Sequence, residues 1–292
     1  MTIFHNLLVG LSGTDGDGDL IRYASEVARI LKPAKIDFVH VRSGDGPTRE
    51  TIFHELDKNP GELLSETRVG TNTLSGRPPD ELIKFAVAHK TDLILVGQRK
   101  DLPGRRSLAR RLVMNAPCSV WMVPHGTPRS FDRIIAPVDF SAPAAEGLRI
   151  AAGFASIADA DYLHPLHVYF NDTVVTYDER DQAIRKEKNE AFERFAASID
   201  LRHFQKQLIF EEGPNIARAI NRVAAQLGAN LTIMATRGRS RAASLILKSE
   251  TENTIIESQI PVLAVKRSGA RINLLQALLD KKFWRKPTPR FG

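Results

Sequence analysis

The sequence predicts an α/β protein made of two similar halves, each a doubly wound parallel sheet with helices on both faces. Short apolar runs of strand length alternate with stretches of helical spacing along the 292 residues, a pattern typical of parallel sheets covered by helices. The order of these segments occurs twice, so that Ser12 corresponds to Asp139, 127 positions later, and Gly97 corresponds to Ala235. We therefore interpret the chain as a duplicated α/β unit.

Five strands and three helices are predicted in the first half. The expected strands are Leu7–Leu11, Ile36–Val41, Arg68–Leu74, Asp92–Val96 and Ser119–Val123. The expected helices are Leu20–Leu31, a helix that is opened by Gly76-Arg77-Pro78-Pro79 and runs through Ala88, and Leu108–Met114. The second helix opens with two prolines, which suit a first helical turn because a proline there leaves no N–H group unpaired. A polar, weakly patterned region follows the second strand over residues 42–66.

The second half repeats this order with clearer patterns. Its expected strands are Arg133–Val138, Asp161–Val168, Gln205–Phe210, Leu231–Ala235 and Val262–Val265. Its expected helices are Ala142–Ile157, Thr176–Ala197, Asn215–Leu227 and a stretch near Leu245–Glu257. Since right-handed crossovers connect parallel strands, each half should be a Rossmann-like, five-stranded parallel sheet.

A segment rich in turn-forming residues, Pro124–Ser130, marks the boundary between the halves. We expect one domain at residues 1–126, a second at residues 131–267, and a tail at residues 268–292. A length of 292 residues agrees with two domains of roughly 150 residues each. Hydrophobic residues make up 42% of the chain and charged residues 26%, so each half can bury a core.

The composition points to a cytoplasmic protein. The single cysteine, Cys118, excludes an intramolecular disulfide framework and fits a reducing compartment. The N-terminal segment Met1–Asn6 has no basic stretch typical of a signal peptide. No apolar run reaches the roughly 20 residues that a membrane span needs, so we do not expect a transmembrane protein.

The net charge of +7 is concentrated in the tail. The tail contains six basic residues and one acid, which are Arg271, Lys281, Lys282, Arg285, Lys286, Arg290 and Asp280. Its net charge is 6 − 1 = +5, so the two halves together have a net charge of 7 − 5 = +2. Because the body of the protein is nearly neutral, we do not expect it to bind nucleic acid.

The tail itself has the pattern of a short amphipathic basic helix. Ile272, Leu275 and Leu279 recur at helical spacing before the basic residues. Such a segment could pack on its own domain, dock a protein partner, or touch an anionic membrane surface. The sequence leaves these three alternatives open.

The residues that carry chemistry are expected at the carboxyl ends of the strands, where doubly wound sheets bind their ligands. In the second half these positions are Asp139, Val168 and the segment that begins at Ala235. An acid after the first strand can bind ribose hydroxyls. A glycine such as Gly238 lets backbone N–H groups approach a phosphate, and a hydroxyl such as that of Ser249 at a helix start can donate to the same phosphate.

These motifs together resemble the universal stress protein family in its tandem form. The resemblance rests on Val138-Asp139-Phe140-Ser141, on His167-Val168, on Ala235-x2-Gly238-x9-Lys248-Ser249-Glu250-Thr251, and on Pro261–Val265. The family motif is Gly-x2-Gly-x9-Gly-(Ser/Thr) after the fourth strand. Each motif alone is weak, but their order and spacing together are specific and cover the chain to about residue 267.

The resemblance implies ATP or another adenine nucleotide as ligand, with or without Mg²⁺. Asp139 would bind the ribose, and the backbone of Val168 would meet the adenine edge. Ala235 and Gly238 would line the ribose and phosphates, and Ser249 and Thr251 would hold the phosphates. Ala235 replaces the first glycine of the motif and Lys248 replaces the third. The Lys248 ammonium could reach a phosphate or be a surface charge.

The first half departs further from the family pattern. Ser12 stands at the position of Asp139, and the loop from Gly97 to Ser107 is about four residues shorter than the family spacing. We expect a degenerate nucleotide site there, in a half that supports its partner. A basic patch formed by Arg105, Arg106, Arg110 and Arg111 could replace the phosphate loop.

Three other patterns are interpreted as structural. Asp15, Asp17 and Asp19 resemble part of a calcium loop, but Leu20 occupies the position that needs glycine, so we expect a turn before a capped helix. His164 and His167 are three residues apart on a strand and should lie on opposite faces, which disfavours a shared metal. Cys118 precedes an apolar strand and is expected in the core.

The favoured function is a nucleotide-responsive stress or regulatory protein that binds ATP, ADP or AMP in its second half. We expect binding rather than catalysis, and at most slow ATP hydrolysis, because no general base is identifiable. The main alternative is a nucleotide-free interaction module that docks a partner through Arg271–Gly292; an adenine-binding enzyme is a third. The resemblance further implies that the fifth strands pair antiparallel, so that one chain mimics a homodimer, and a homodimer of the chain is plausible.

Overall fold

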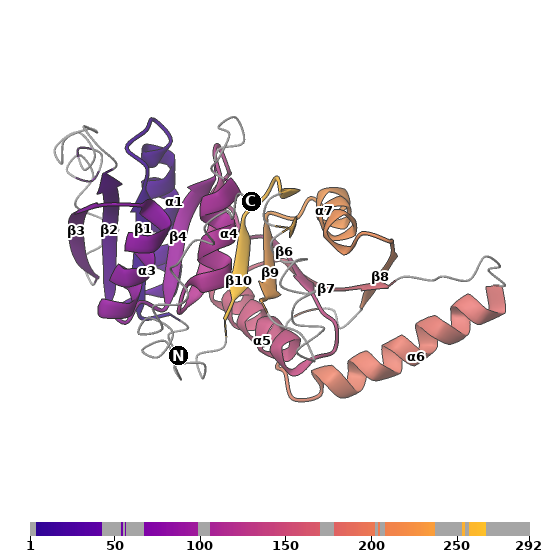
Figure 1. The fold of residues 1–292 in the computed structure, drawn as a ribbon. Helices are drawn as coiled ribbons and strands as arrows, with labels where there is room; N and C mark the ends of the chain where they lie inside the picture. The colour runs from indigo at the N-terminus through magenta and orange to yellow at the C-terminus, as the bar shows by residue number, and fades with distance from the viewer. Residues whose placement is uncertain are drawn as a thin grey trace, which may run out of the picture.

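A computed structural model shows the fold of this protein. It describes residues 4–42, 54, 56, 67–98, 106–169, 178–201, 204, 208–236, 253–254 and 257–266. Within these residues ten strands form a single sheet in the order β3-β2-β1-β4-β5-β10-β9-β6-β7-β8, with helices on both faces (Figure 1). The predicted α/β class with two doubly wound halves is confirmed.

The first half has the elements that the sequence predicts. Its strands are β1 (Asn6–Leu11), β2 (Lys35–Arg42), β3 (Arg68–Ser75), β4 (Leu93–Gln98) and β5 (Ser119–Pro124). Its helices are α1 (Asp17–Leu31), α3 (Pro78–Ala88) and α4 (Arg106–Asn115). Helix α1 begins three residues before the predicted start, and its N-cap, Gly16, makes no side-chain cap bond. The expected capped start is therefore wrong, because the Asp17 carboxylate binds the preceding turn instead.

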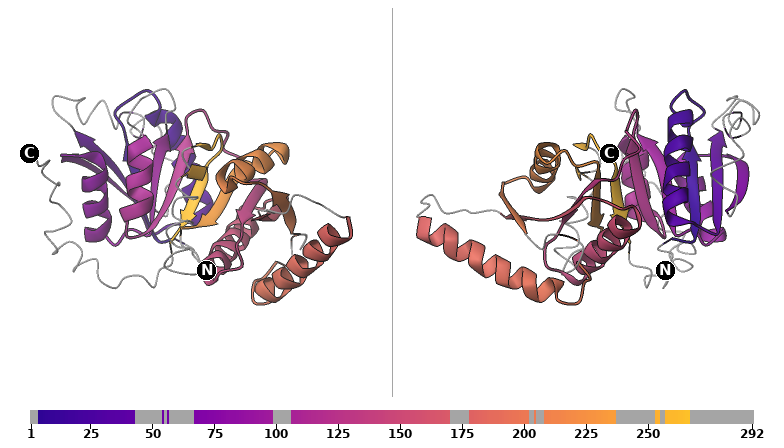
Figure 2. Two further views of the ribbon diagram at one scale, coloured as in Figure 1. Left: turned by 45° about the vertical axis from the view of Figure 1, so that its right-hand side comes forward. Right: turned by 180° about the vertical axis from the view of Figure 1, so that it is seen from behind.

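The second half follows the same plan. Its strands are β6 (Arg133–Pro137), β7 (Tyr162–Tyr169), β8 (Ile209–Glu212), β9 (Leu231–Ala235) and β10 (Val262–Val265). Its helices are α5 (Ala142–Ile157), α6 (Asp178–Ala196) and α7 (Ile216–Gln226). Most of the helix expected near Leu245–Glu257 lies outside the described residues. Helix α6 extends away from the rest of the molecule (Figure 2).

Strand β8 differs from the prediction. The sequence suggested Gln205–Phe210, whereas β8 begins at Ile209. Its parallel pairing runs from Leu166–Ile209 to Tyr169–Glu212, along the last four residues of β7. Pairing with the backbone of β7 therefore sets the position of β8, and the apolar pattern of the sequence is not sufficient to locate it.

The two halves join at their fifth strands. Strands β5 and β10 pair antiparallel, with Trp121 opposite Leu263. All other pairings in the sheet are parallel. The Lys266 N–H group also donates to the Ser119 hydroxyl across this junction, at 3.1 Å. The expected antiparallel edge pairing is confirmed, while the idea that it copies a family homodimer stays a prediction.

Apolar side chains fill both faces of the sheet. On one face α1 and α5 cover a core that is shared by both halves, and Phe192 of α6 belongs to it. On the other face α3, α4 and α7 cover a second core. Among the helices that the structure describes, none has the combination of length and apolar character needed to cross a membrane.

Candidate functional site

In the second half, three of the predicted site residues lie at the ends of three adjacent strands. Strands β9, β6 and β7 are neighbours in the sheet and parallel. Ala235 ends β9, Asp139 follows β6, and Val168 is the next-to-last residue of β7. Because β6 and β9 flank the point where the strand order reverses, this is where a doubly wound sheet opens a crevice for a ligand.

The pairing of β6 with β9 ends before these residues. Their pairing covers Ile134–Leu231 and Ile135–Thr232, whereas the equivalent strands of the first half pair from Leu7–Leu93 to Gly10–Val96. The last residues of β6 and β9 therefore extend beyond their shared hydrogen bonds.

Asp139 presents a carboxylate beyond the paired part of β6 and β9. Its Oδ1 accepts a hydrogen bond from the Ser141 N–H group at 3.1 Å, and the side chain is half-buried. Among the described residues, this is the one hydrogen bond that the Asp139 carboxylate accepts. The other oxygen can thus accept from a ligand. Next along the chain, the Ser141 hydroxyl caps α5 by accepting from the Ala144 N–H group at 3.2 Å.

His167 supports both residues that flank Asp139. Its Nδ1 lies 2.9 Å from the Val138 carbonyl oxygen, which identifies Nδ1 as the protonated nitrogen when the ring is neutral. Its ring stacks on Phe140 with centroids 4.5 Å apart. Phe140 has a φ of 58°, a left-handed conformation that is uncommon for a bulky residue. Burial lowers the pKa of His167, and the bond to Val138 opposes part of that change.

Helix α5 packs closely against the end of β9. A Cβ atom at Gly147 would lie 3.1 Å from the Ala235 backbone nitrogen, which is tighter than most Cβ contacts, so a glycine favours this close approach. The N-terminal turn of α5 contains no acidic residue. Asp139 is therefore the acid that directly precedes α5 in the chain. The first turn of the helix carries no negative charge that would repel an anion.

The equivalent region of the first half is arranged differently. The Ser12 N–H and hydroxyl groups donate to Asp17 Oδ1 at 2.9 and 2.8 Å, and the Gly13 N–H group donates to Asp17 Oδ2 at 2.6 Å. The Asp17 side chain is buried and holds the turn. Asp17 is thus occupied by the protein itself, in contrast to Asp139. His40 repeats the contact of His167, with Nδ1 3.2 Å from the Leu11 carbonyl oxygen.

A cavity of about 360 Å³ lies at the ends of β1 and β4 in the first half. Its walls include Ser12, Val41 and Gly97. These residues correspond in the repeat to Asp139, Val168 and Ala235. The cavity therefore occupies, in the first half, the place that the sequence assigns to a ligand in the second.

A family model matches the chain twice, over residues 4–124 and 130–266, and its description is the universal stress protein family. The chain belongs to the universal stress protein family. The two matches give it the tandem, two-domain form.

Two solved structures have the same fold over most of this chain. A universal stress protein from Archaeoglobus fulgidus DSM 4304 is 18% identical, with 90% of this chain and 96% of that chain covered and a TM-score of 0.60. A functionally unknown protein from Pseudomonas aeruginosa PAO1 is 20% identical, with 92% and 94% covered and a TM-score of 0.71. A universal stress protein in complex with cAMP is 18% identical, with 42% and 98% covered and a TM-score of 0.37. No curated protein matches the chain.

Four predicted site residues of this universal stress protein lie outside the described residues. They are Gly238, Lys248, Ser249 and Thr251. Their roles toward phosphates stay predictions, as does the effect of Lys248 in place of a glycine. The structure brings Asp139, Val168 and Ala235 to one edge of the sheet. It also places His167 against both neighbours of Asp139, a role that the sequence pattern does not indicate.

The remaining patterns have structural explanations. Asp19 pairs with Arg22 at 2.6 Å, and within the described residues no cluster of His, Cys, Asp and Glu could hold a metal ion. His164 stacks on Tyr162, while His167 stacks on Phe140. Cys118 is buried, and that burial raises the pKa of its thiol to about 12.

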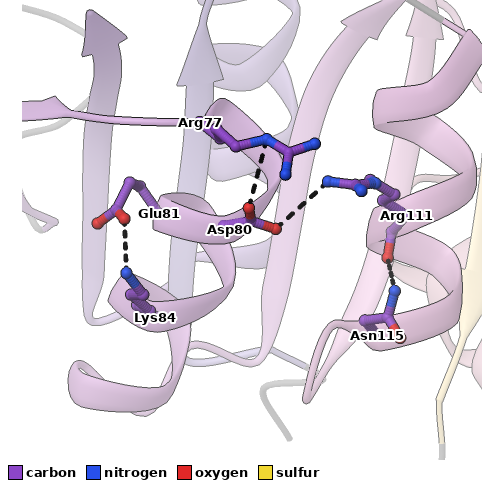
Figure 3. Close-up of polar contacts among 6 residues, drawn as sticks. All are labelled: Arg77, Asp80, Glu81, Lys84, Arg111 and Asn115. Atoms are coloured by element: carbon purple, nitrogen blue, oxygen red, sulfur yellow. Dashed lines mark hydrogen bonds and ion pairs between the residues drawn. The ribbon is translucent and has the colours of Figure 1, made fainter. Parts of the chain in front are cut away.

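The predicted basic patch of the first half is only partly described. Arg105 lies outside the described residues. Arg111 on α4 reaches Asp80 on α3, with Nη1 3.5 Å from Oδ1, and Arg77 Nε lies 3.7 Å from Oδ2 of the same carboxylate (Figure 3). Arg111 is therefore paired with an acid and helps to hold α3 beside α4.

Proposed function

We propose that this universal stress protein is a regulatory protein that binds an adenine nucleotide in its second half. The observation that carries the proposal is the Asp139 carboxylate, half-buried beyond the paired part of β6 and β9 with one oxygen bound to Ser141. A carboxylate in this position can accept hydrogen bonds from the two ribose hydroxyls. Charge-assisted bonds of this kind are about twice as strong as neutral ones.

The other two described residues have suitable positions for the rest of the ligand. Val168 lies one strand away from Asp139, where its backbone could meet the adenine edge. Ala235 is small, lies on the opposite side of Asp139, and leads into the segment predicted to hold the phosphates. The absence of acids in the first turn of α5 removes one source of repulsion for a phosphate group.

The proposed activity is binding and signalling. The nucleotide would order the segment between Arg237 and Lys248, and a partner would respond to the change. ATP, ADP and AMP are the candidates, and a cytoplasmic location is part of the proposal. A partner bound through Arg271–Gly292 and a homodimer stay separate predictions, since the tail lies outside the described residues.

The test is nucleotide-dependent thermal stabilisation of the full chain. We expect ATP, ADP or AMP at 100 times its Kd to stabilise the wild type by about 2.7 kcal/mol, which raises the melting temperature by several degrees. Asp139→Ala should lose most of this shift, and Asp139→Asn should keep part of it. Ser12→Ala, at the equivalent position of the first half, is the matched control and should respond like the wild type.

Two results would count against this function. One is a wild type whose melting temperature does not move with any adenine nucleotide, including cAMP. The other is an Asp139→Ala variant that binds as tightly as the wild type. Identifying any nucleotide released when the purified protein is denatured would decide between ATP, ADP and AMP.

A further inference from the structure

We infer that the cavity of the first half is a second ligand site, for a neutral small molecule with an apolar body and a hydrogen-bond acceptor. This inference does not depend on nucleotide binding in the second half. It concerns the part of the chain in which the family motif is degenerate, and it assigns a different class of ligand to that part.

The position and size of the cavity are those of a binding site. It lies over the ends of β1 and β4, where the strand order of the first half reverses. Its volume of about 360 Å³ falls within the range of roughly 300–1,000 Å³ that is usual for small-molecule pockets. Helices α3 and α4, which supply Leu82 and Leu108 to its wall, are bridged by the Asp80–Arg111 pair (Figure 3).

The walls are mainly apolar. Aliphatic side chains from five elements face the cavity, and four of them are buried in the core beneath it. These side chains are Leu20, Val41, Leu82, Leu108 and Val123. Burying an apolar ligand surface against them yields about 25 cal/mol per Å² before the costs of association.

The charged groups at the cavity disfavour a phosphate. Asp17 and Asp19 both line it, and no lysine or arginine occurs among the described residues that do. His125 lies at the same place, with Nε2 3.7 Å from Asp19 Oδ2. A phosphate close to a carboxylate is repelled, and the repulsion is stronger near a protein surface than in bulk water. A neutral ligand avoids this repulsion.

Tyr23 supplies a polar group for such a ligand. The residue lines the cavity, is 1% exposed, and has a hydroxyl oxygen without a hydrogen-bond partner among the described residues. A buried polar group without a partner is costly, and a ligand carbonyl or ether oxygen could accept from it. Burial raises the pKa of Tyr23 well above its usual value, and the nearby Trp121 indole N–H group, which can only donate to the phenol oxygen, opposes part of the change. The phenol therefore keeps its proton and can donate it to a ligand.

Gly97 keeps the cavity open. It is the next-to-last residue of β4, it lines the cavity and it is exposed. Among the described residues, a Cβ atom at this position would meet Leu20 alone, at 3.6 Å. The second half has Ala235 at this position. A larger side chain at residue 97 would therefore fill the ligand space without overlapping the backbone.

The test uses Prodan, a neutral naphthalene with a carbonyl oxygen whose emission shifts to the blue in apolar surroundings. We expect the full chain to bind one Prodan. Gly97→Leu should weaken binding at least tenfold, and Gly97→Ala should weaken it less. Tyr23→Phe should weaken Prodan about fivefold, the effect of one neutral hydrogen bond, and leave the carbonyl-free analogue 2-(dimethylamino)naphthalene unchanged.

Asp139→Ala is the control that separates the two sites. It should bind Prodan like the wild type, and excess ATP should not displace Prodan from it. Displacement by ATP in this variant, or undiminished binding by a folded Gly97→Leu variant, would overturn the inference. If leucine at residue 97 prevents folding, Gly97→Ala and Tyr23→Phe decide the question, and undiminished Prodan binding by both would contradict it.

Discussion

His167 contacts the chain on both sides of the Asp139 carboxylate, through the Val138 carbonyl oxygen and the Phe140 ring. A residue that contacts both neighbours of this carboxylate controls where the carboxylate lies. Asp139, Val168 and Ala235 were predictable because position at a strand end is enough to select them. His167 was not, because its importance comes from contacts. The repeat contained a hint, since His40 stands 127 positions earlier and makes the same contact with Leu11.

This contact predicts a pH dependence. The pKa of His167 is lowered mainly by burial, raised in part by the Val138 bond, lowered by Lys188 and raised by Asp139. The folded chain therefore binds this proton less readily than the unfolded chain. The stability that results is fully present above the unfolded pKa, near 6.5, and is lost as the pH falls below it toward the folded pKa.

We expect urea unfolding between pH 7 and pH 5 to show a steeper loss of stability for the wild type than for His167→Gln. His5→Gln, which changes an exposed histidine far from Asp139 in the sequence, is the control and should keep the wild-type slope. Equal slopes for all three proteins would show that His167 does not titrate as its surroundings predict.

At the scale of elements, the apolar patterns located nearly every strand and helix because each segment is buried on the face that its pattern indicates. Two element boundaries are exceptions, because they depend on contacts with other segments that the local apolar pattern does not encode. β8 is placed by the end of β7, and the start of α1 is placed by the hydrogen bonds of Asp17. The first-half cavity was not predicted for a related reason. Ser12 in place of an acid and the shortened loop after Gly97 argue against a nucleotide, but they do not indicate which side chains line the cavity.

Gly70 of β3 lies against a buried acid of β2, which gives a prediction for this edge of the sheet. Gly70 lies opposite Asp37 in the register, and a Cβ atom at residue 70 would overlap Asp37 Oδ1. Asp37 is 4% exposed and pairs with Lys35 at 2.7 Å. Gly70→Ala should therefore destabilise the protein by about 1–3 kcal/mol, the usual cost of overpacking, measured by urea unfolding.

The cause can be separated from a general effect of alanine in β3. Combining Gly70→Ala with Asp37→Ala removes the overlap, so the double variant should lose less stability than the sum of the two single variants. Strict additivity would mean that the contact between these residues is not responsible.

At the scale of the whole molecule, the two halves share one sheet and one aromatic cluster. Tyr23 and Trp121 of the first half meet Phe131 and Phe154 of the second, with ring centroids 5.3 to 6.1 Å apart and edge-on geometry. Trp121 is also opposite Leu263 in the β5–β10 junction. The duplicated halves thus differ in their proposed ligands but depend on each other for their core.

This shared core predicts that the halves unfold as one unit. In a Trp284→Phe background, Trp121 is the single tryptophan and reports on the junction, while far-UV circular dichroism reports on the whole chain. Ile220→Ala truncates the second half and Phe85→Ala the first, at residues that are 1% and 6% exposed. Each should cost about 2–5 kcal/mol, and each should shift the fluorescence and dichroism transitions together. Two dichroism transitions, or a Trp121 transition that responds to only one of these substitutions, would show that the halves are independent despite the continuous sheet.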